Sequence, residues 1–137
     1  MKPATRDALV ARLAEFGRVV EVGIGNRPDV AEALADRVAV TATDVVPREV
    51  PEGVRFVVDD VTDPSPDVYE AADALYALNL PPELHRPALA VARRHDAVLA
   101  FTTLGAEQPA VPVRRETIPG ETLFWAGERG PRDESPR

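Results

Sequence analysis

The segment Glu21–Pro28, which reads Glu-Val-Gly-Ile-Gly-Asn-Arg-Pro, restricts the fold more than any other stretch of the sequence. A valine-rich run precedes it at Arg18–Gly23, and the apolar pattern of a helix follows it at Pro28–Arg37. One glycine permits a tight bend, and a second lets the backbone approach a ligand because no Cβ is in the way. A helix that opens behind the turn aims free N–H groups at the same place. The segment therefore predicts a strand, a glycine turn and a helix, in the order found in nucleotide-binding sites.

The rest of the chain alternates between strand and helix patterns. We expect helices at Thr5–Phe16, Pro28–Arg37 and residues 81–95, and a short helical turn at Asp67–Asp73. We expect strands at Arg18–Gly23, Val38–Asp44, Val54–Asp59, Ala74–Asn79 and Ala97–Thr103, and a final hairpin from Val113–Ile118 and Glu121–Ala126. Thr5 and Asn26 are the expected N-cap residues of the first two helices.

This alternation predicts an α/β protein, a Rossmann-like three-layer αβα sandwich with a mostly parallel sheet. Right-handed crossovers give the strand order 3-2-1-4-5, with the C-terminal hairpin at the far edge. We expect a single domain over residues 1–128 and a flexible tail over 129–137. Ligands in such sheets bind beyond the carboxyl ends of the strands, at the switch point between strands 1 and 4.

Composition narrows the function classes. The chain has 137 residues, of which 45% are apolar, enough to build one core. Cysteine is absent, so disulfides and zinc-thiolate sites are excluded, and with only His85 and His95 we predict no metal site. The N-terminus lacks the profile of a signal peptide, and no apolar run approaches the roughly 20 residues of a membrane span. We therefore expect a cytoplasmic protein without a membrane partner.

The charge balance is acidic. Net charge is −7, and Lys2 is the single lysine. This composition resembles that of proteins from salt-loving archaea, although a GC-rich genome favours the same residues. Acidity repels polyanions, so a nucleic-acid partner is not expected. In concentrated salt a Debye length of about 3 Å hides most of this repulsion, which leaves nucleic acid open for a halophile.

Acidic residues close the second and third expected strands. Asp44 follows Gly25 by 19 residues, close to the spacing of roughly 20 at which an acid holds ribose hydroxyls. A carboxylate can accept two hydroxyl hydrogen bonds at once; alternatively, Asp44 caps the turn that follows. Asp59 and Asp60 end the next strand, where one carboxylate can meet the exocyclic amine of an adenine. Their alternative is an ordinary turn.

These residues resemble the Rossmann-like S-adenosylmethionine-dependent methyltransferases. Glu21, Gly23 and Gly25 look like the first motif of that superfamily, in which the acid faces the methionine part of the cofactor and the glycine turn passes under it. Asp44 matches the ribose-binding acid, and Asp59 or Asp60 falls at the adenine-contacting position. The resemblance implies S-adenosylmethionine as the cofactor, with Asn26, the next residue of the turn, among the residues that bind it.

A closer resemblance covers about residues 18–128. This part is similar to a small archaeal family of uncharacterised proteins that carry Glu-Val-Gly-Ile-Gly, Thr-Ala-Thr-Asp and Pro-Pro-Glu-Leu in this order. Because no activity is established for that family, the resemblance implies a fold more than a function.

Two positions depart from the nucleotide-binding patterns. Arg27 stands where methyltransferases usually carry a third glycine, and Pro28 stands where NAD fingerprints need glycine or alanine. Pro28 therefore disfavours an NAD-linked oxidoreductase. The run Asn79–Glu83 resembles the Asn-Pro-Pro-aromatic motif of amine methyltransferases, but it has an inserted leucine and ends in glutamate. Two prolines that start a helix after a strand are the alternative.

The substrate side of the expected cleft would be lined by Tyr76, Asn79, Glu83 and His85, and Glu83 or His85 are the candidates for a catalytic base. We predict an S-adenosylmethionine-binding, methyltransferase-like protein of unknown substrate. The alternative is a non-catalytic cofactor-binding module that acts as a subunit or sensor, which the small size favours. In either case a homodimer or a protein partner would complete the cleft.

Overall fold

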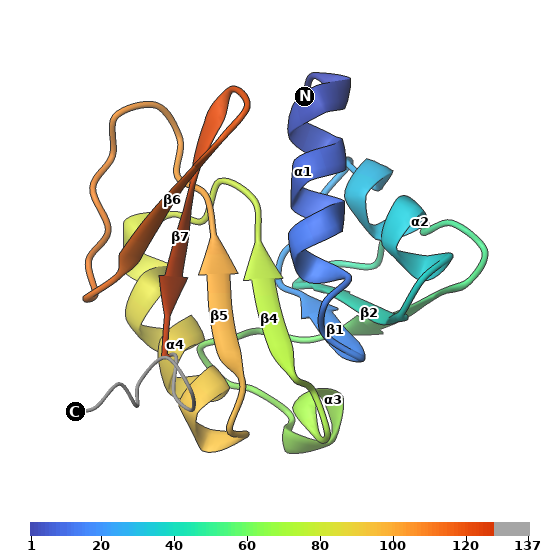
Figure 1. Ribbon diagram of the computed structural model, residues 1–137. Coiled ribbons are helices and arrows are strands. Elements are labelled where there is room, and N and C mark those ends of the chain that lie inside the picture. The colour runs from blue at the N-terminus through green and yellow to red at the C-terminus, as the bar shows by residue number, and fades with distance from the viewer. Residues whose placement is uncertain (128–137) are drawn as a thin grey trace.

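The computed structural model describes residues 1–127 and is built around one seven-stranded sheet with the order β3-β2-β1-β4-β5-β7-β6 (Figure 1). The strands are β1 (Arg18–Glu21), β2 (Ala39–Asp44), β3 (Val54–Val58), β4 (Ala74–Ala77), β5 (Val98–Phe101), β6 (Arg114–Ile118) and β7 (Glu121–Ala126). Strands β1 to β5 are parallel, and the β6–β7 hairpin adds antiparallel to β5. The predicted order 3-2-1-4-5 with an edge hairpin is confirmed. The tail expected at residues 129–137 lies outside the described residues.

Helices cover both faces of the sheet. They are α1 (Pro3–Leu13), α2 (Asp29–Ala35), α3 (Pro66–Tyr69) and α4 (His85–Arg94), and the 3-10 turn η1 (Pro82–Leu84) leads directly into α4. In Figure 1, α1 and α2 lie on one side of the strands, and α3 and α4 lie on the other. The three-layer αβα sandwich predicted from the sequence is therefore confirmed.

Successive side chains along the central strands point into two different cores, one on each face of the sheet. Val19 and Tyr76 point into the core under α1 and α2, whereas their neighbours Val20 and Leu75 point into the core under α3 and α4. This period of two is the normal consequence of strand geometry. Because both faces are covered, the central strands are apolar on both sides, as parallel sheets generally are.

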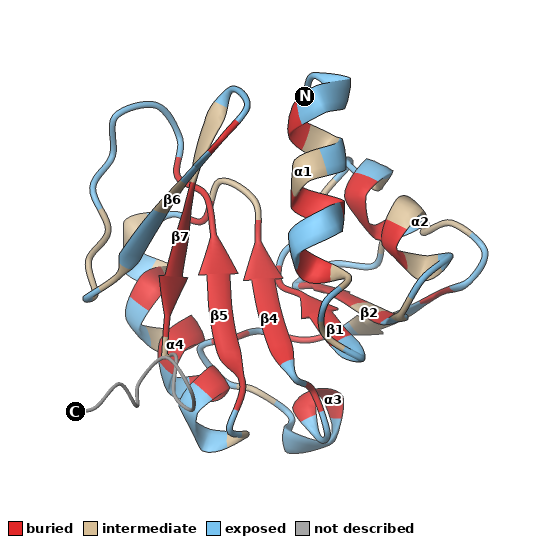
Figure 2. Cartoon of the chain, in the orientation of Figure 1, coloured by how far each residue is buried: buried red, intermediate tan, exposed pale blue. Residues whose placement is uncertain are grey.

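The two strands of the hairpin differ in solvent exposure (Figure 2). Strand β7 is mostly buried, whereas β6 is mostly exposed along its length. The guanidinium groups of Arg114 and Arg115 lie 5.6 and 5.4 Å from the ring centres of Trp125 and Phe124. Charged side chains on an edge strand prevent another chain from pairing with it.

The first helix begins earlier than expected. Its first residue is Pro3, and Thr5 does not cap it but lies inside its first turn. Proline suits this position because its missing N–H would be unpaired there anyway. The Thr5 hydroxyl instead donates to the carbonyl of Pro119 in the hairpin turn (2.6 Å). Gly120 leaves room for this contact, since a Cβ there would lie 2.8 Å from Thr5 Oγ1.

Candidate functional site

The glycine turn leads from β1 to α2 at the switch point of the sheet. Two backbone bonds fix it to the neighbouring strands: Val22 N–H donates to the carbonyl of Tyr76 in β4 (2.8 Å), and Ile24 N–H donates to that of Thr43 in β2 (2.9 Å). Both glycines have left-handed backbones, with φ of 72° at Gly23 and 59° at Gly25. A Cβ at either position would meet no atom within 4 Å. The turn therefore needs glycine for its conformation and leaves open space above it.

Asp44 links the end of β2 to this turn. Its Oδ2 accepts a hydrogen bond from Gly25 N–H (2.8 Å), and its Oδ1 accepts from Val46 N–H (3.4 Å). The 19-residue spacing thus brings the acid and the glycine into direct contact. The alternative role as the cap of the following turn is also realised, through Val46. Asp44 itself is only 8% exposed.

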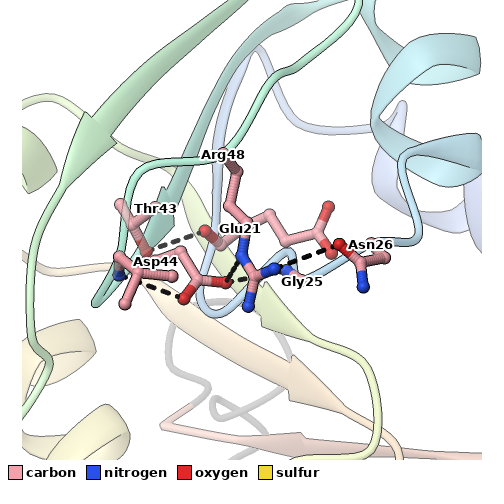
Figure 3. A network of polar contacts seen from close by, with 7 residues as sticks. Glu21, Gly25, Asn26, Thr43, Asp44 and Arg48 are labelled. Carbon is pink, nitrogen blue, oxygen red and sulfur yellow. Dashed lines mark hydrogen bonds and ion pairs between the residues drawn. The ribbon is translucent and has the colours of Figure 1, made fainter.

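Arg48, which the sequence analysis did not single out, reaches from the β2–β3 loop over the glycine turn (Figure 3). Its Nη1 donates to Oδ1 of Asn26 (3.0 Å). Its Nε lies 3.3 Å from Asp44 Oδ2 without the alignment of a hydrogen bond, so that contact is electrostatic. We expected Asn26 to cap α2, but it does not. The N-cap position belongs to Pro28, and the amide oxygen of Asn26 binds Arg48 instead. The sequence feature that could have indicated this contact is the position of Arg48, four residues after Asp44.

Glu21 ends β1 and is buried below the turn, with 1% of its surface exposed. The Tyr76 hydroxyl donates to its Oε1 (2.6 Å). Burial raises the pKa of Glu21 to about 8, although the hydrogen bond from Tyr76 and the charge of Arg27 oppose this shift. The carboxyl is therefore mostly protonated at neutral pH. We expected Tyr76 to line an open cleft. Instead it is 1% exposed and faces Glu21.

The two acids after β3 mainly organise their own chain segment. Asp59 accepts from the Tyr69 hydroxyl (2.6 Å) and from Ser65 N–H (2.9 Å), which fastens α3 to the strand end. Asp60 is exposed and its Oδ1 accepts from the hydroxyl and N–H of Thr62. These bonds lower the pKa of Asp60. The sequence left open that these two acids only form an ordinary turn, and Asp60 does form such a turn.

Asn79 and Arg27 meet beyond the end of β4. Asn79 has a left-handed backbone (φ 56°), and its N–H donates to Thr102 Oγ1 (2.8 Å). In the amide orientation that satisfies both neighbours, its Nδ2 donates to the Thr103 carbonyl (3.2 Å) and its Oδ1 accepts from Nη1 (3.0 Å) and Nη2 (3.1 Å) of Arg27. Arg27, at the position of the usual third glycine, thus extends across the switch point.

His85, which the sequence suggested as a substrate-side residue and candidate catalytic base, is buried inside the protein and bonded to backbone groups. It is fully buried, its Nε2 lies 2.9 Å from the Leu80 carbonyl, and its Nδ1 accepts from Ala110 N–H (2.9 Å). Because Nδ1 accepts from Ala110 N–H, Nε2 is the ring nitrogen that can donate to the Leu80 carbonyl. Both nitrogens are engaged, so neither is placed to accept a proton from a substrate. Glu83 lies exposed on η1.

Over residues 1–127, no group of three or more histidine, cysteine, aspartate or glutamate side chains is arranged to hold a metal ion. Within the same range, none of the helices is long and apolar enough to cross a membrane.

Solved structures with this fold include several S-adenosylmethionine-dependent methyltransferases. The RNA methyltransferase of Salinibacter ruber, solved with S-adenosyl-L-homocysteine, superposes with a TM-score of 0.65 over 92% of this chain and 91% of its own, at 13% identity. The TehB-like S-adenosylmethionine-dependent methyltransferase of Corynebacterium glutamicum gives a TM-score of 0.62 over 90% and 86%, at 19% identity. At these identities the likeness establishes a methyltransferase-like fold.

Sequence relatives are archaeal. A UPF0146 protein of Halobacterium salinarum is 58% identical over 120 residues, which cover 86% of this chain and 93% of the relative. Residues 5–129 match the model of the uncharacterised protein family UPF0146. The chain therefore belongs to the uncharacterised protein family UPF0146.

Proposed function

We propose that this protein binds S-adenosylmethionine over the carboxyl ends of β1, β2 and β4, as a small methyltransferase-like protein. The observation that carries the proposal is the open glycine turn joined to Asp44 by the 2.8 Å bond from Gly25 N–H. This turn lies at the topological switch point, where sheets of this type bind ligands. The S-adenosylhomocysteine bound by the Salinibacter ruber relative in fold makes this cofactor class the first to test.

In this proposal Asp44 accepts the ribose hydroxyls, and Gly23 and Gly25 pass beneath the methionine part of the cofactor. Glu21, below the turn, is a mostly protonated acid that supports the turn from the inside. Asn26 and Asp44 are bridged by Arg48, so the ribose must displace or share this guanidinium. Binding is then an exchange of partners at Asp44.

The adenine would be contacted by one of the two acids after β3. Both carboxylate oxygens of Asp59 accept bonds from its own segment. Asp60 is exposed, with its bonds to Thr62 on one oxygen. We therefore assign the adenine contact to Asp60 rather than Asp59.

Calorimetric titration with S-adenosylmethionine, S-adenosylhomocysteine and NAD tests the cofactor class. We expect binding of the first two and none of NAD. Asp44→Asn should weaken binding by about 10- to 100-fold, since bonds to a charged acceptor contribute about 1.5–3 kcal/mol. Glu52→Gln, an exposed change in the loop that follows Asp44, is the matched control. The absence of binding at millimolar concentration, or equal affinity in Asp44→Asn, would overturn the proposal.

A non-catalytic binding module is the second candidate. It is favoured by the bonding of His85, because both ring nitrogens are engaged within the protein, and by the exposed position of Glu83. Incubation with methyl-labelled S-adenosylmethionine and archaeal metabolite extract separates the candidates. Label transfer that is lost in Asp44→Asn supports an enzyme, whereas cofactor binding without transfer supports a module. Light scattering tests the further proposal that a second subunit completes the cleft.

A further inference from the structure

A cavity of about 280 Å³ lies beside the glycine turn, between the start of α1, the end of β5 and the hairpin turn. The polar side chains that line it are Lys2, Thr5, Arg27, Asn79, Thr102 and Glu121. Gly25 and Asp44 are not among its lining residues, so it is separate from the proposed ribose side. It therefore offers space for a second molecule next to the cofactor.

This cavity is positive on an otherwise acidic protein. The chain carries a net charge of −7 and has one lysine, and that lysine lines the cavity together with Arg27. Lys2 also immediately precedes α1, an 11-residue helix whose N-terminus contributes partial positive charge. Glu121 is the one acid among the cavity residues, and burial raises its pKa. The local charge favours an anion.

Arg27 is held in place at the edge of this cavity. Asn79 accepts from both of its terminal nitrogens, and Asn79 is itself fixed by Thr102 Oγ1 and the Thr103 carbonyl. Asn79 keeps its left-handed backbone within this arrangement. Within residues 1–127, the bonds to Asn79 use two of the five guanidinium N–H groups. The planar fork of the others matches a carboxylate, which accepts two parallel bonds.

We propose that this cavity binds the carboxylate of an acidic acceptor molecule, with Arg27 as the forked donor and Lys2 as the second positive charge. The assignment rests on the proposed function, because it places the acceptor beside the cofactor. The methionine part of the cofactor is expected over the glycine turn. Its carboxylate is the competing source of the same chemistry, and the test must separate the two.

Malonate, a small dicarboxylate, is the probe, titrated at constant ionic strength and followed by the amide signals of Gly120 and Glu121. We expect saturable binding both to the free protein and to the protein saturated with S-adenosylhomocysteine. Arg27→Met and Lys2→Met should each weaken it, Arg27→Met by about 10- to 100-fold. Arg86→Met, which removes an exposed charge from α4, should leave it unchanged. Because Lys2 is exposed, its variant remains informative if Arg27→Met fails to fold.

Three results overturn the proposal: malonate shifts that do not saturate, unchanged malonate affinity in both variants, or loss of malonate binding on saturation with S-adenosylhomocysteine. In the third case the cofactor itself occupies the cavity. Arg27→Met should then weaken S-adenosylhomocysteine but spare 5′-methylthioadenosine, which lacks the carboxylate. If S-adenosylhomocysteine does not bind the wild-type protein, the proposed function fails, while the titration of the free protein still decides the malonate site.

Discussion

The two sides of the switch point present their charges differently. On the ribose side, Asp44 is bonded to Gly25 and paired with Arg48. On the acceptor side, Lys2 and Arg27 line a cavity with a single acid, Glu121. In our proposals, a ligand on the first side replaces an existing partner of Asp44, whereas a ligand on the second adds bonds to Lys2 and Arg27. The charge that each side offers a ligand thus depends on how many of its charged side chains are already paired within the protein.

Glu21 lies between the two sides, and its replacement has the largest expected effect. The folded protein keeps a proton on Glu21 up to a pKa of about 8, whereas the unfolded chain loses it near 4.5. Unfolding therefore releases a proton between these values, and stability falls as pH rises, by up to about 1.4 kcal/mol per pH unit. Glu21→Gln should remove this dependence, as measured by urea denaturation at pH 5, 6.5 and 8.

The control for this measurement is Glu52→Gln, an exposed change that should retain the wild-type pH dependence. Parallel stability profiles for wild type and Glu21→Gln would contradict the assignment of the proton to Glu21. They would also contradict the proposal that Glu21 supports the glycine turn as a protonated acid.

Replacing His85, which bonds to Leu80 next to the cavity residue Asn79, gives the next largest effect. His85→Leu leaves the Leu80 carbonyl and the Ala110 N–H without their partner, which should cost about 2–3 kcal/mol of stability. Binding of S-adenosylhomocysteine should change little, because His85 bonds to Leu80 and Ala110 and not to the glycine turn or Asp44. Thermal denaturation and calorimetry measure both, with His95→Gln as a control. A large loss of cofactor affinity at unchanged stability would instead make His85 a site residue.

The exchange on the ribose side is tested by Arg48→Ala. Removing the guanidinium frees Asp44 for the ribose, so the affinity for S-adenosylhomocysteine should rise about fivefold, corresponding to an ion pair of about 1 kcal/mol. Calorimetry should give wild-type affinity for Arg55→Ala, an exposed change on β3. A fall in affinity would mean that Arg48 binds the cofactor rather than competing with it.

The smallest expected effect concerns the rim of the acceptor cavity. Thr5→Val removes the bond to the Pro119 carbonyl at similar volume, which should lower stability by about 1 kcal/mol. Malonate affinity should fall only slightly, since Thr5 contributes no charge. Thr117→Val, an exposed change on β6, is the control for urea denaturation. Equal stability of the two variants would mean that the hairpin turn does not depend on Thr5.

The fold was predictable because its signals are local. Apolar periodicity located the strands, and the valines of β1 alternate between the two cores as strand geometry requires. That Gly25 and Asp44 lie at the same edge of the sheet was predictable as well, because one follows β1 and the other ends the adjacent β2; the hydrogen bond between them was not predicted. These inferences needed no knowledge of side-chain contacts.

The remaining features depend on contacts between distant segments. His85 is buried against Phe101 and accepts from Ala110 N–H, 25 residues away, and its own helix pattern carries no sign of these contacts. Tyr76 faces the core and donates to Glu21 on the neighbouring strand, a contact that the pattern of its own strand does not indicate. Arg48 lies in a loop without periodicity, so its direction follows only from its contacts with Asn26 and Asp44 in the folded protein.

The bond between Thr5 and Pro119 joins positions 114 residues apart, which bears on how the molecule folds. Long-range pairings form late, because the entropy of closing a large loop is lost before the contact is gained. The glycine turn, by contrast, needs only β1, β2 and β4. During synthesis the strands of the proposed cofactor site therefore leave the ribosome before the hairpin that forms one wall of the proposed acceptor cavity.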